Sequence, residues 1–236
     1  AIALGDMGRR EEAVAAYRRA LDLYRGLPDC EHNQARCLRN IGVALYAAGR
    51  YEDAMTANQQ ELDLYRGLQD GEQQANCLCN TAVILRTMGD DEEAVAAYRK
   101  ALSLYHGLPD SEQDQANCLY NTGNVLHKTE RHEEALASYQ DALTIFRKAD
   151  GTQYQQAICL NNTATTLERM GRYKEAPTAY HSALKLDRSL PDNEQQQAEC
   201  LFNIGNSLYA MERHEEALAS YQDVLTLFRQ VGDTPH

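Results

Sequence analysis

One short phrase recurs along the chain at a nearly constant spacing, and this constrains the fold more than any other feature of the sequence. The phrase reads Gly-Arg-Tyr-Glu-Asp-Ala at residues 49–54, and related versions occupy residues 89–94 and 171–176. Successive copies start 40 or 41 residues apart, at Gly8, Gly49, Gly89, Glu130, Gly171 and Glu212. Because the period extends over nearly all 236 residues, the sequence predicts an array of similar structural units.

Each unit is predicted to contain two helices. Apolar residues fall at helical spacing from about residue 72 to 88, and again from about 91 to 106. Gly89 lies between the two segments as a plausible helix terminator. Pro177 falls inside the second helix of its unit, so we expect that helix to start late or to kink there. Capping-box spacing to a following Gln predicts four N-caps, at Asp70, Asp110, Asp150 and Asp192.

Equivalent positions of the units repeat the same kinds of side chain, which indicates what packs. Small residues recur in the first helices at Gly42, Ala82, Gly123, Ala164 and Gly205. An aromatic position recurs in the second helices at Tyr17, Tyr98, Tyr139, Tyr180 and Tyr221, with Asn58 as the exception. We interpret a third set as small buried residues: Cys37, Cys77, Cys118, Cys159 and Cys200.

A small residue in the first helix, Gly between the helices, and Ala, an aromatic residue and Ala in the second resemble the tetratricopeptide repeat. A HEAT array has a similar period and is the structural alternative, but it is not expected to keep the Gly and Ala positions together. The units resemble the longer variant of the repeat seen in kinesin light chains, LGN-type adaptors and NTPase-associated arrays. The resemblance implies an all-α fold, a right-handed α-solenoid of stacked antiparallel helix pairs.

The repeat boundaries follow from the period. We expect one array over residues 1–236, divided into a partial first repeat and five complete ones: 1–29, 30–70, 71–110, 111–151, 152–192 and 193–236. The chain opens inside the pattern and without an initiator Met, so we expect it to be part of a longer protein. The last helix carries apolar residues with no following repeat, which predicts further repeats or end-to-end self-association: Leu225, Leu227, Phe228 and Val231.

Composition narrows the possible partners. The net charge of −12 disfavours binding to nucleic acid and to anionic membranes, since both need a basic surface. No apolar stretch reaches the ~18 residues of a membrane helix, and no signal-peptide pattern is present. The seven Cys do not have the spacing of a small secreted scaffold, so we expect free thiols and a cytoplasmic protein.

A helical wheel of the first helices separates a packed side from a free side. With the recurrent Asn at zero, the Leu, Gly or Ala, and Cys positions fall on one arc, and the opposite arc is free of them. In the family that this chain resembles, the first helices line the concave wall, which makes the free arc a candidate ligand surface. The predicted ligand-binding residues on it are Arg36, Arg39, Asn40, Tyr46, Asn80, Arg86, Asn117, Tyr120, Asn121, Asn124, His127, Lys128, Asn161, Asn162, Arg169, Asn203 and Asn206.

The free arc is basic although the chain is acidic. It carries five Arg or Lys residues against two Glu, Glu168 and Glu199, a net charge of +3. We therefore hypothesise an extended acidic peptide as ligand, paired through its backbone with one Asn amide per repeat. Two alternatives stay open at this point. Each Asn would instead satisfy a neighbouring helix or loop, and the charge excess would be scatter among five units.

No pattern of catalysis or cofactor binding is present. The recurrent Cys residues lie a full repeat apart and cannot converge on one metal ion. His132 and His214 share a position with Tyr51 and Tyr173, so we interpret them as packing residues. The sequence predicts a non-catalytic scaffold for a protein or peptide, with no cofactor and no metal. The alternative is a sensor array of a larger signalling NTPase or protease that recognises a whole protein.

Overall fold

The computed structural model describes residues 9–232, which form helices and turns without a strand. In chain order the helices are α2 (Arg10–Arg25), α3 (Glu31–Ala47), α4 (Tyr51–Gly67), α5 (Gly71–Met88), α6 (Asp91–Tyr105), α7 (Glu112–Lys128), α8 (His132–Phe146), α9 (Gln153–Arg169), α10 (Ala176–Asp187), α11 (Glu194–Ala210) and α12 (His214–Gly232). The predicted two helices per period are therefore present. Gly8, the first residue of the first phrase, lies outside the described residues.

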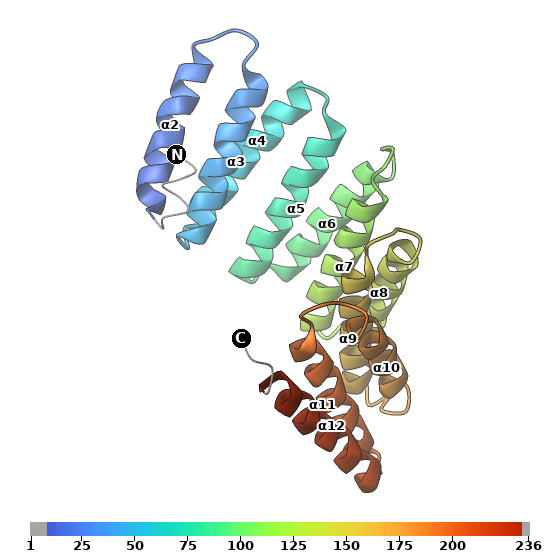
Figure 1. The fold of residues 1–236 in the computed structure, drawn as a ribbon. Helices are drawn as coiled ribbons and strands as arrows, with labels where there is room; N and C mark the ends of the chain where they lie inside the picture. The colour runs from blue at the N-terminus through green and yellow to red at the C-terminus, as the bar shows by residue number, and fades with distance from the viewer. Residues whose placement is uncertain (1–8, 233–236) are drawn as a thin grey trace. The chain divides into compact units, whose positions relative to one another are not determined.

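The described chain divides into two compact units, with the border inside α7 after Cys118. In the first unit, each helix from α2 to α6 packs on the next in the chain. In the second unit, the same is true from α8 to α12. Figure 1 shows that successive helices within a unit run in opposite directions. This confirms the predicted all-α architecture of stacked antiparallel helix pairs.

Small and aromatic residues at the recurrent positions form the packed side of each helix pair. The recurrent Ala of the second helices is almost fully inaccessible at Ala54, Ala94, Ala135, Ala176 and Ala217. The five recurrent Cys residues are buried free thiols, as predicted from the helical wheel. Because a small side chain lets two helices approach closely, these residues determine how tightly each pair can pack.

The turns between repeats correct one sequence prediction. Of the four predicted N-caps, Asp70 accepts a hydrogen bond from the backbone N–H of Gln73 at 3.1 Å. At the other three turns the helix begins two or three residues after the Asp, so Asp110, Asp150 and Asp192 are not its N-caps. At these turns the side chain of the residue one or two positions later donates a hydrogen bond to the end of the preceding helix. The Ser111 hydroxyl, for example, donates to the carbonyl of Tyr105 at the end of α6, at 2.6 Å.

Backbone conformation explains two of the corrected caps, Asp110 and Asp192. Asp29, Asp110 and Asp192 each follow a proline and have φ between 51° and 54°, in the left-handed region. A residue with positive φ closes a turn and does not have the extended backbone of an N-cap. The prediction at Pro177 is confirmed, since α10 begins late, at Ala176, with Pro177 in its first turn. The helix start is the position that tolerates proline best.

The last helix leaves part of its apolar side uncovered within the described residues. The exposed fractions are 57% for Leu218, 57% for Leu225 and 53% for Phe228. The side chain of Val231, predicted to join them, lies outside the described part. In residues 9–232, no helix combines the length and the apolar character that crossing a membrane requires.

Candidate functional site

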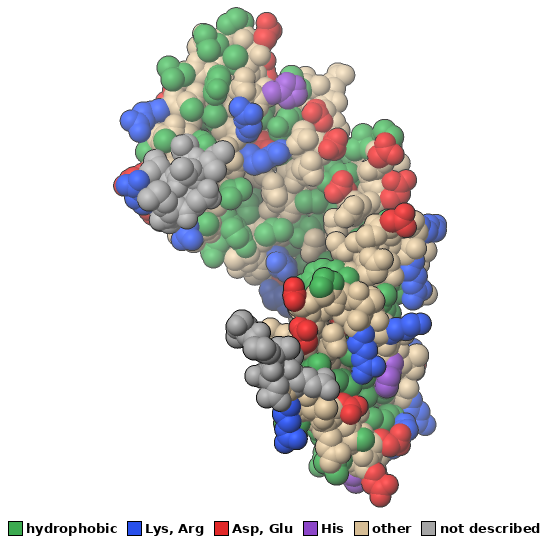
Figure 2. All heavy atoms as spheres, in the orientation of Figure 1, with side chains coloured by type: hydrophobic (Ala, Val, Ile, Leu, Met, Phe, Trp, Pro, Cys, Tyr) green, Lys and Arg blue, Asp and Glu red, His purple; other side chains and the backbone are tan. Residues whose placement is uncertain are grey.

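The predicted ligand-binding residues all lie on the first helix of a repeat, and none of them is buried. They belong to α3, α5, α7, α9 and α11. Arg36, Asn80, Asn117, Lys128 and Arg169 are among the exposed ones, and the recurrent Asn40, Asn121 and Asn203 are half-buried. In the face seen in Figure 2, acidic and basic side chains are interspersed, without one broad area of a single sign.

In two repeats, α7–α8 and α11–α12, a tyrosine of the second helix packs on a glycine of the first helix. A Cβ atom added to Gly123 would lie 2.6 Å from the ring of Tyr139, so only glycine fits under that ring. The Tyr139 hydroxyl then donates to Asn124 Oδ1 at 2.8 Å. The last repeat has the same arrangement, where the Tyr221 ring lies against Gly205.

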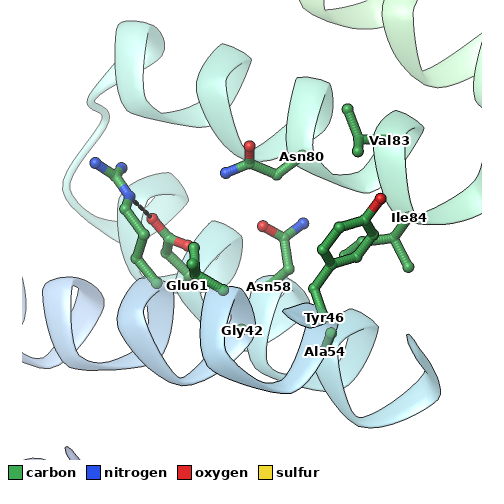
Figure 3. Close-up of a pocket in the computed structure, with 10 residues that line it drawn as sticks. Gly42, Tyr46, Ala54, Asn58, Glu61, Asn80, Val83 and Ile84 are labelled. Atoms are coloured by element: carbon green, nitrogen blue, oxygen red, sulfur yellow. Dashed lines mark hydrogen bonds and ion pairs between the residues drawn. The ribbon is translucent and has the colours of Figure 1, made fainter. Parts of the chain in front are cut away.

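The repeat of α3 and α4 lacks this tyrosine and has a pocket in its place. Asn58 stands at the tyrosine position, and a Cβ atom on Gly42 would meet no atom closer than 3.7 Å. The pocket has a volume of about 120 Å³ and lies between α3, α4 and α5. Figure 3 shows Asn58 and Glu61 of α4 on one side of it, with Tyr46 of α3 and Asn80 of α5 nearby. The pocket therefore brings together predicted residues from two first helices.

The pocket wall includes the polar side chain of Asn58, which a neighbouring helix holds in place. The Asn58 amide donates to the backbone carbonyl of Cys77 at 2.9 Å and to Thr81 Oγ1 at 2.7 Å, which uses both of its protons. Asn58 is only 4% exposed. These two bonds hold the side chain against α5, so Asn58 is part of a rigid wall.

A buried carboxylate neutralises one of the predicted basic residues. Glu61 is 1% exposed, and its Oε1 atom accepts from Arg39 Nε at 2.7 Å. Arg39 Nη2 also donates to Gln73 Oε1 at 2.6 Å, and the guanidinium lies 5.9 Å from the ring centre of Tyr65. Burial raises the pKa of Glu61 and the Arg39 charge opposes that rise. Arg39 is therefore paired within the scaffold, and Glu61 of α4 balances its charge.

Asn58 and Glu61 are the residues of this site that the helical wheel missed, because the wheel considered only first helices. The signal was nevertheless present in the second helices. Asn58 interrupts the tyrosine position, and Glu61 stands where the other repeats have Ala20, Ala101, Ala142, Ala183 and Val224. Two departures from the pattern, one turn apart, mark the place where the repeat no longer fills its own interior.

In the second unit the predicted residues form a hydrogen-bonded network. The Asn162 amide of α9 donates to Asn124 Oδ1 at 2.9 Å and to the Tyr120 hydroxyl at 3.1 Å, both on α7. Asn124 also accepts from Tyr139. Asn162 thus links two neighbouring repeats, which is the structural alternative left open for the recurrent Asn.

One further residue of the free arc, His127, makes a hydrogen bond inside its unit. The Nδ1 atom of His127 lies 2.8 Å from Thr166 Oγ1, and burial lowers the pKa of this histidine with help from His132 and Arg169. The His127 and His132 rings are 5.5 Å apart, which agrees with a packing role for His132. A neutral imidazole at this place acts as a hydrogen-bonding group and adds no positive charge.

The hydroxyl of Tyr98 shows what happens when the pattern is only half kept. Tyr98 is 1% exposed, and its buried hydroxyl has no hydrogen-bond partner. The residue that corresponds to Asn124 in this repeat is Val83, which cannot accept a hydrogen bond. In the preceding repeat the corresponding residue is Val43, and there the tyrosine is replaced by Asn58.

A metal ion requires several thiol, imidazole or carboxylate groups that converge on one point. Within residues 9–232, no group of three or more His, Cys, Asp or Glu side chains is arranged to hold a metal ion. The Sγ atoms of Cys79 and Cys118 lie 3.1 Å apart. This contact lowers the pKa of Cys79 and raises that of Cys118.

Family models match the sequence over most of its length. A tetratricopeptide-repeat model matches residues 1–67, 114–189 and 164–230, and a second one matches residues 75–105. The chain belongs to the tetratricopeptide repeat family. No curated protein sequence is similar enough to count as a relative.

Solved structures of tetratricopeptide proteins resemble this one. BtubC (BKLC) from P. vanneervenii has a TM-score of 0.81 at 17% identity, covering 96% of this chain and 94% of that chain. A putative kinesin light chain with nearly identical TPR-like repeats from Podosopora anserina has a TM-score of 0.72 at 11% identity, covering 88% and 100%. MamA from Desulfovibrio magneticus RS-1 has a TM-score of 0.65 at 18% identity, covering 85% and 97%.

All three identities are low, so these likenesses show the fold alone, an all-α tetratricopeptide solenoid. Tetratricopeptide arrays generally act as non-catalytic scaffolds for other proteins. The family therefore indicates a protein-interaction scaffold, and it leaves the choice of partner to the side chains described above.

Proposed function

We propose that this chain binds an extended peptide segment of a partner protein along the exposed side of its first helices, the concave side in this family. The observation that carries the proposal is the pocket of the α3–α4 repeat. Three residues selected for exposure on the helical wheel, Arg39, Tyr46 and Asn80, line that pocket together. A recess with an apolar interior and a few polar groups is the usual form of a binding site.

The ligand that fits this surface best is acidic. Arg36, Arg86 and Arg169 lie on the first helices and are exposed or half-buried. Arg39 contributes little to the attraction of an acidic ligand because Glu61 balances its charge. Exposed charges attract an acidic segment over about 10 Å at moderate salt, so the preference is expected to weaken as salt rises.

A peptide library tests the proposal. The chain is immobilised, peptides of varied charge are captured at two salt concentrations, and the bound peptides are identified by mass spectrometry. We expect acidic peptides to be enriched at low salt and lost at high salt. Arg36→Ala, Arg86→Ala and Arg169→Ala combined should weaken capture.

Arg213→Ala is the matched control, because this arginine pairs with Glu216 at the start of a second helix and lies away from the first-helix surface. It removes one positive charge without touching the proposed surface, so capture should not change, and it is compared with Arg36→Ala, Arg86→Ala and Arg169→Ala as single variants. Enrichment of neutral or basic peptides, or equal loss in the control, would contradict an acidic ligand.

The exposed apolar residues of α12 favour a second interaction, with another copy of this chain. Leu218, Leu225 and Phe228 are each more than half exposed. We expect the protein to form dimers at high concentration and Leu225→Glu combined with Phe228→Glu to keep it monomeric, as measured by analytical ultracentrifugation. A protein that stays monomeric at all concentrations would contradict this contact.

A further inference from the structure

The α3–α4 repeat keeps the glycine that receives a tyrosine ring but has lost the ring. In the α7–α8 repeat the ring of Tyr139 lies so close to Gly123 that no Cβ atom fits there. Gly42 likewise has no side chain, yet the atoms nearest to a Cβ added to it would be 3.7 and 3.8 Å away. The space over Gly42 therefore corresponds to the place of a missing aromatic side chain.

The size of the pocket agrees with this correspondence. Its volume is about 120 Å³. An engineered protein cavity of roughly 150 Å³ lined by apolar side chains binds benzene. A single six-membered ring is thus the scale of ligand that this pocket can take, and a second ring would not fit beside it.

The lining suits one aromatic ring that packs against apolar side chains and carries a polar group at its end. Gly42, Val43 and Ile84 offer apolar surface from α3 and α5. Both amide protons of Asn58 are used within the scaffold, which leaves its carbonyl oxygen as an acceptor. Figure 3 shows Asn58 and Asn80 on facing sides of the pocket. A phenol ring that enters between them can pack on the apolar lining while its hydroxyl donates a hydrogen bond to an amide oxygen.

The rim of the pocket is accessible from the exposed side of the first helices. Val43 is 63% exposed, and Asn80 is also exposed. Tyr46 stands at the rim, where its hydroxyl hydrogen-bonds with Thr87 at 2.9 Å. A side chain that projects from a peptide on this surface can therefore reach the pocket without any helix moving.

We propose that the pocket between α3, α4 and α5 receives the aromatic side chain of a partner peptide, whose ring takes the place of the tyrosine that this repeat lacks. The inference rests on the proposed peptide-binding function and names the side chain that anchors the peptide. It predicts that aromatic residues are selected at one position of a bound peptide, because a ring buried in a fitted pocket contributes more than its neighbours.

The first experiment uses 4-methylphenol, which carries the ring and hydroxyl of a tyrosine side chain, and the full chain. Binding is measured by ligand-observed NMR. We expect saturable binding to the wild type and at least a tenfold loss in Asn58→Tyr, where the chain's own ring fills the pocket. Asn58→Tyr combined with Glu61→Ala restores both repeat positions and serves if the single variant folds poorly.

A gain of binding is the stricter test. Tyr139→Asn removes the ring that lies over Gly123 and should create a similar pocket in the other repeat. We expect this variant to bind a second equivalent of 4-methylphenol. Arg172→Ala, at an exposed ion pair with Glu175, is the control and should bind like the wild type. No binding to the wild type, or equal binding to Asn58→Tyr, would overturn the inference.

The peptide library separates failure of this inference from failure of the proposed function. Captured peptides should lose binding when their aromatic residue is changed to Ala, and Asn58→Tyr should capture them at least tenfold more weakly. If peptides bind the wild type and Asn58→Tyr equally, the pocket inference is wrong and the scaffold function stands. If the library yields no peptide while 4-methylphenol still binds the pocket, the proposed function is wrong.

Discussion

The repeat of α3 and α4 and the repeat of α7 and α8 use the same backbone design with different interiors. In the latter, Tyr139 packs on Gly123 and completes the repeat from within. In the former, Asn58 and Glu61 replace Tyr and Ala, and a pocket of about 120 Å³ remains over Gly42. The comparison teaches that a repeat scaffold can acquire a cavity by changing two side chains, without inserting a loop or moving a helix.

The largest expected effect comes from making the filled repeat resemble the empty one. Tyr139→Asn removes a ring that is 1% exposed, and so should lower the free energy of unfolding by about 3 kcal/mol. Urea unfolding followed by far-UV circular dichroism measures this loss. Asn already stands at the equivalent position, Asn58, where it makes its own hydrogen bonds. A loss of unfolding free energy below about 1 kcal/mol would show that the Tyr139 ring contributes little to packing.

The next effect contrasts the two glycines. Gly123→Ala places a Cβ atom 2.6 Å from the Tyr139 ring and should cost about 1–3 kcal/mol through overpacking. Gly42→Ala meets only ordinary contacts of 3.7 Å and beyond, so it should be neutral or stabilise the helix by up to about 1 kcal/mol. Paired urea titrations measure both. Equal destabilisation of the two variants would show that no space is available over Gly42.

A smaller effect is expected at the ion pair that only the α3–α4 repeat contains. Arg39→Ala leaves the buried Glu61 without its partner and should cost about 1–2 kcal/mol, a figure reduced because the Arg39 side chain is 35% exposed. Adding Glu61→Ala should recover most of the loss, because Ala occupies this position in the α7–α8 repeat. A double variant no more stable than Arg39→Ala would contradict this account.

The smallest effect is a dependence of stability on pH. Because the pKa of Glu61 is raised in the folded chain, the folded state holds its proton more tightly than the unfolded state does. Stability from this group is therefore complete below the usual glutamate pKa, and it declines as pH rises through the raised value. Wild type and Glu61→Gln should differ in slope over that window when urea midpoints are plotted against pH. Parallel curves would rule out a contribution from Glu61.

Much of the fold could be predicted because helix packing leaves a local trace in the sequence. The recurrent Ala, Tyr and Gly residues follow from how close two helices must come, so their spacing revealed the helix pairs. The N-caps at Asp110, Asp150 and Asp192 could not be predicted in the same way. Their spacing to a following Gln is correct, but the backbone of the turn places other residues at the helix start.

The candidate site was only partly predictable, because its two parts depend on different information. The wheel identified Arg39, Tyr46 and Asn80 as unburied, since exposure on one helix depends on that helix alone. It treated Arg39 as a free charge because Glu61 belongs to the next helix. It also could not show that the Asn162 amide donates a hydrogen bond to Asn124.

The sequence by itself determined the number and order of the helices, the side on which each one packs, and the family. These properties depend on residues close together in the chain and on a period that repeats them. Only the tertiary structure decided that the space over Gly42 is empty, that Glu61 balances Arg39, and which polar groups remain available. Those outcomes depend on side chains from different helices, and their distances are defined only when the helices have docked.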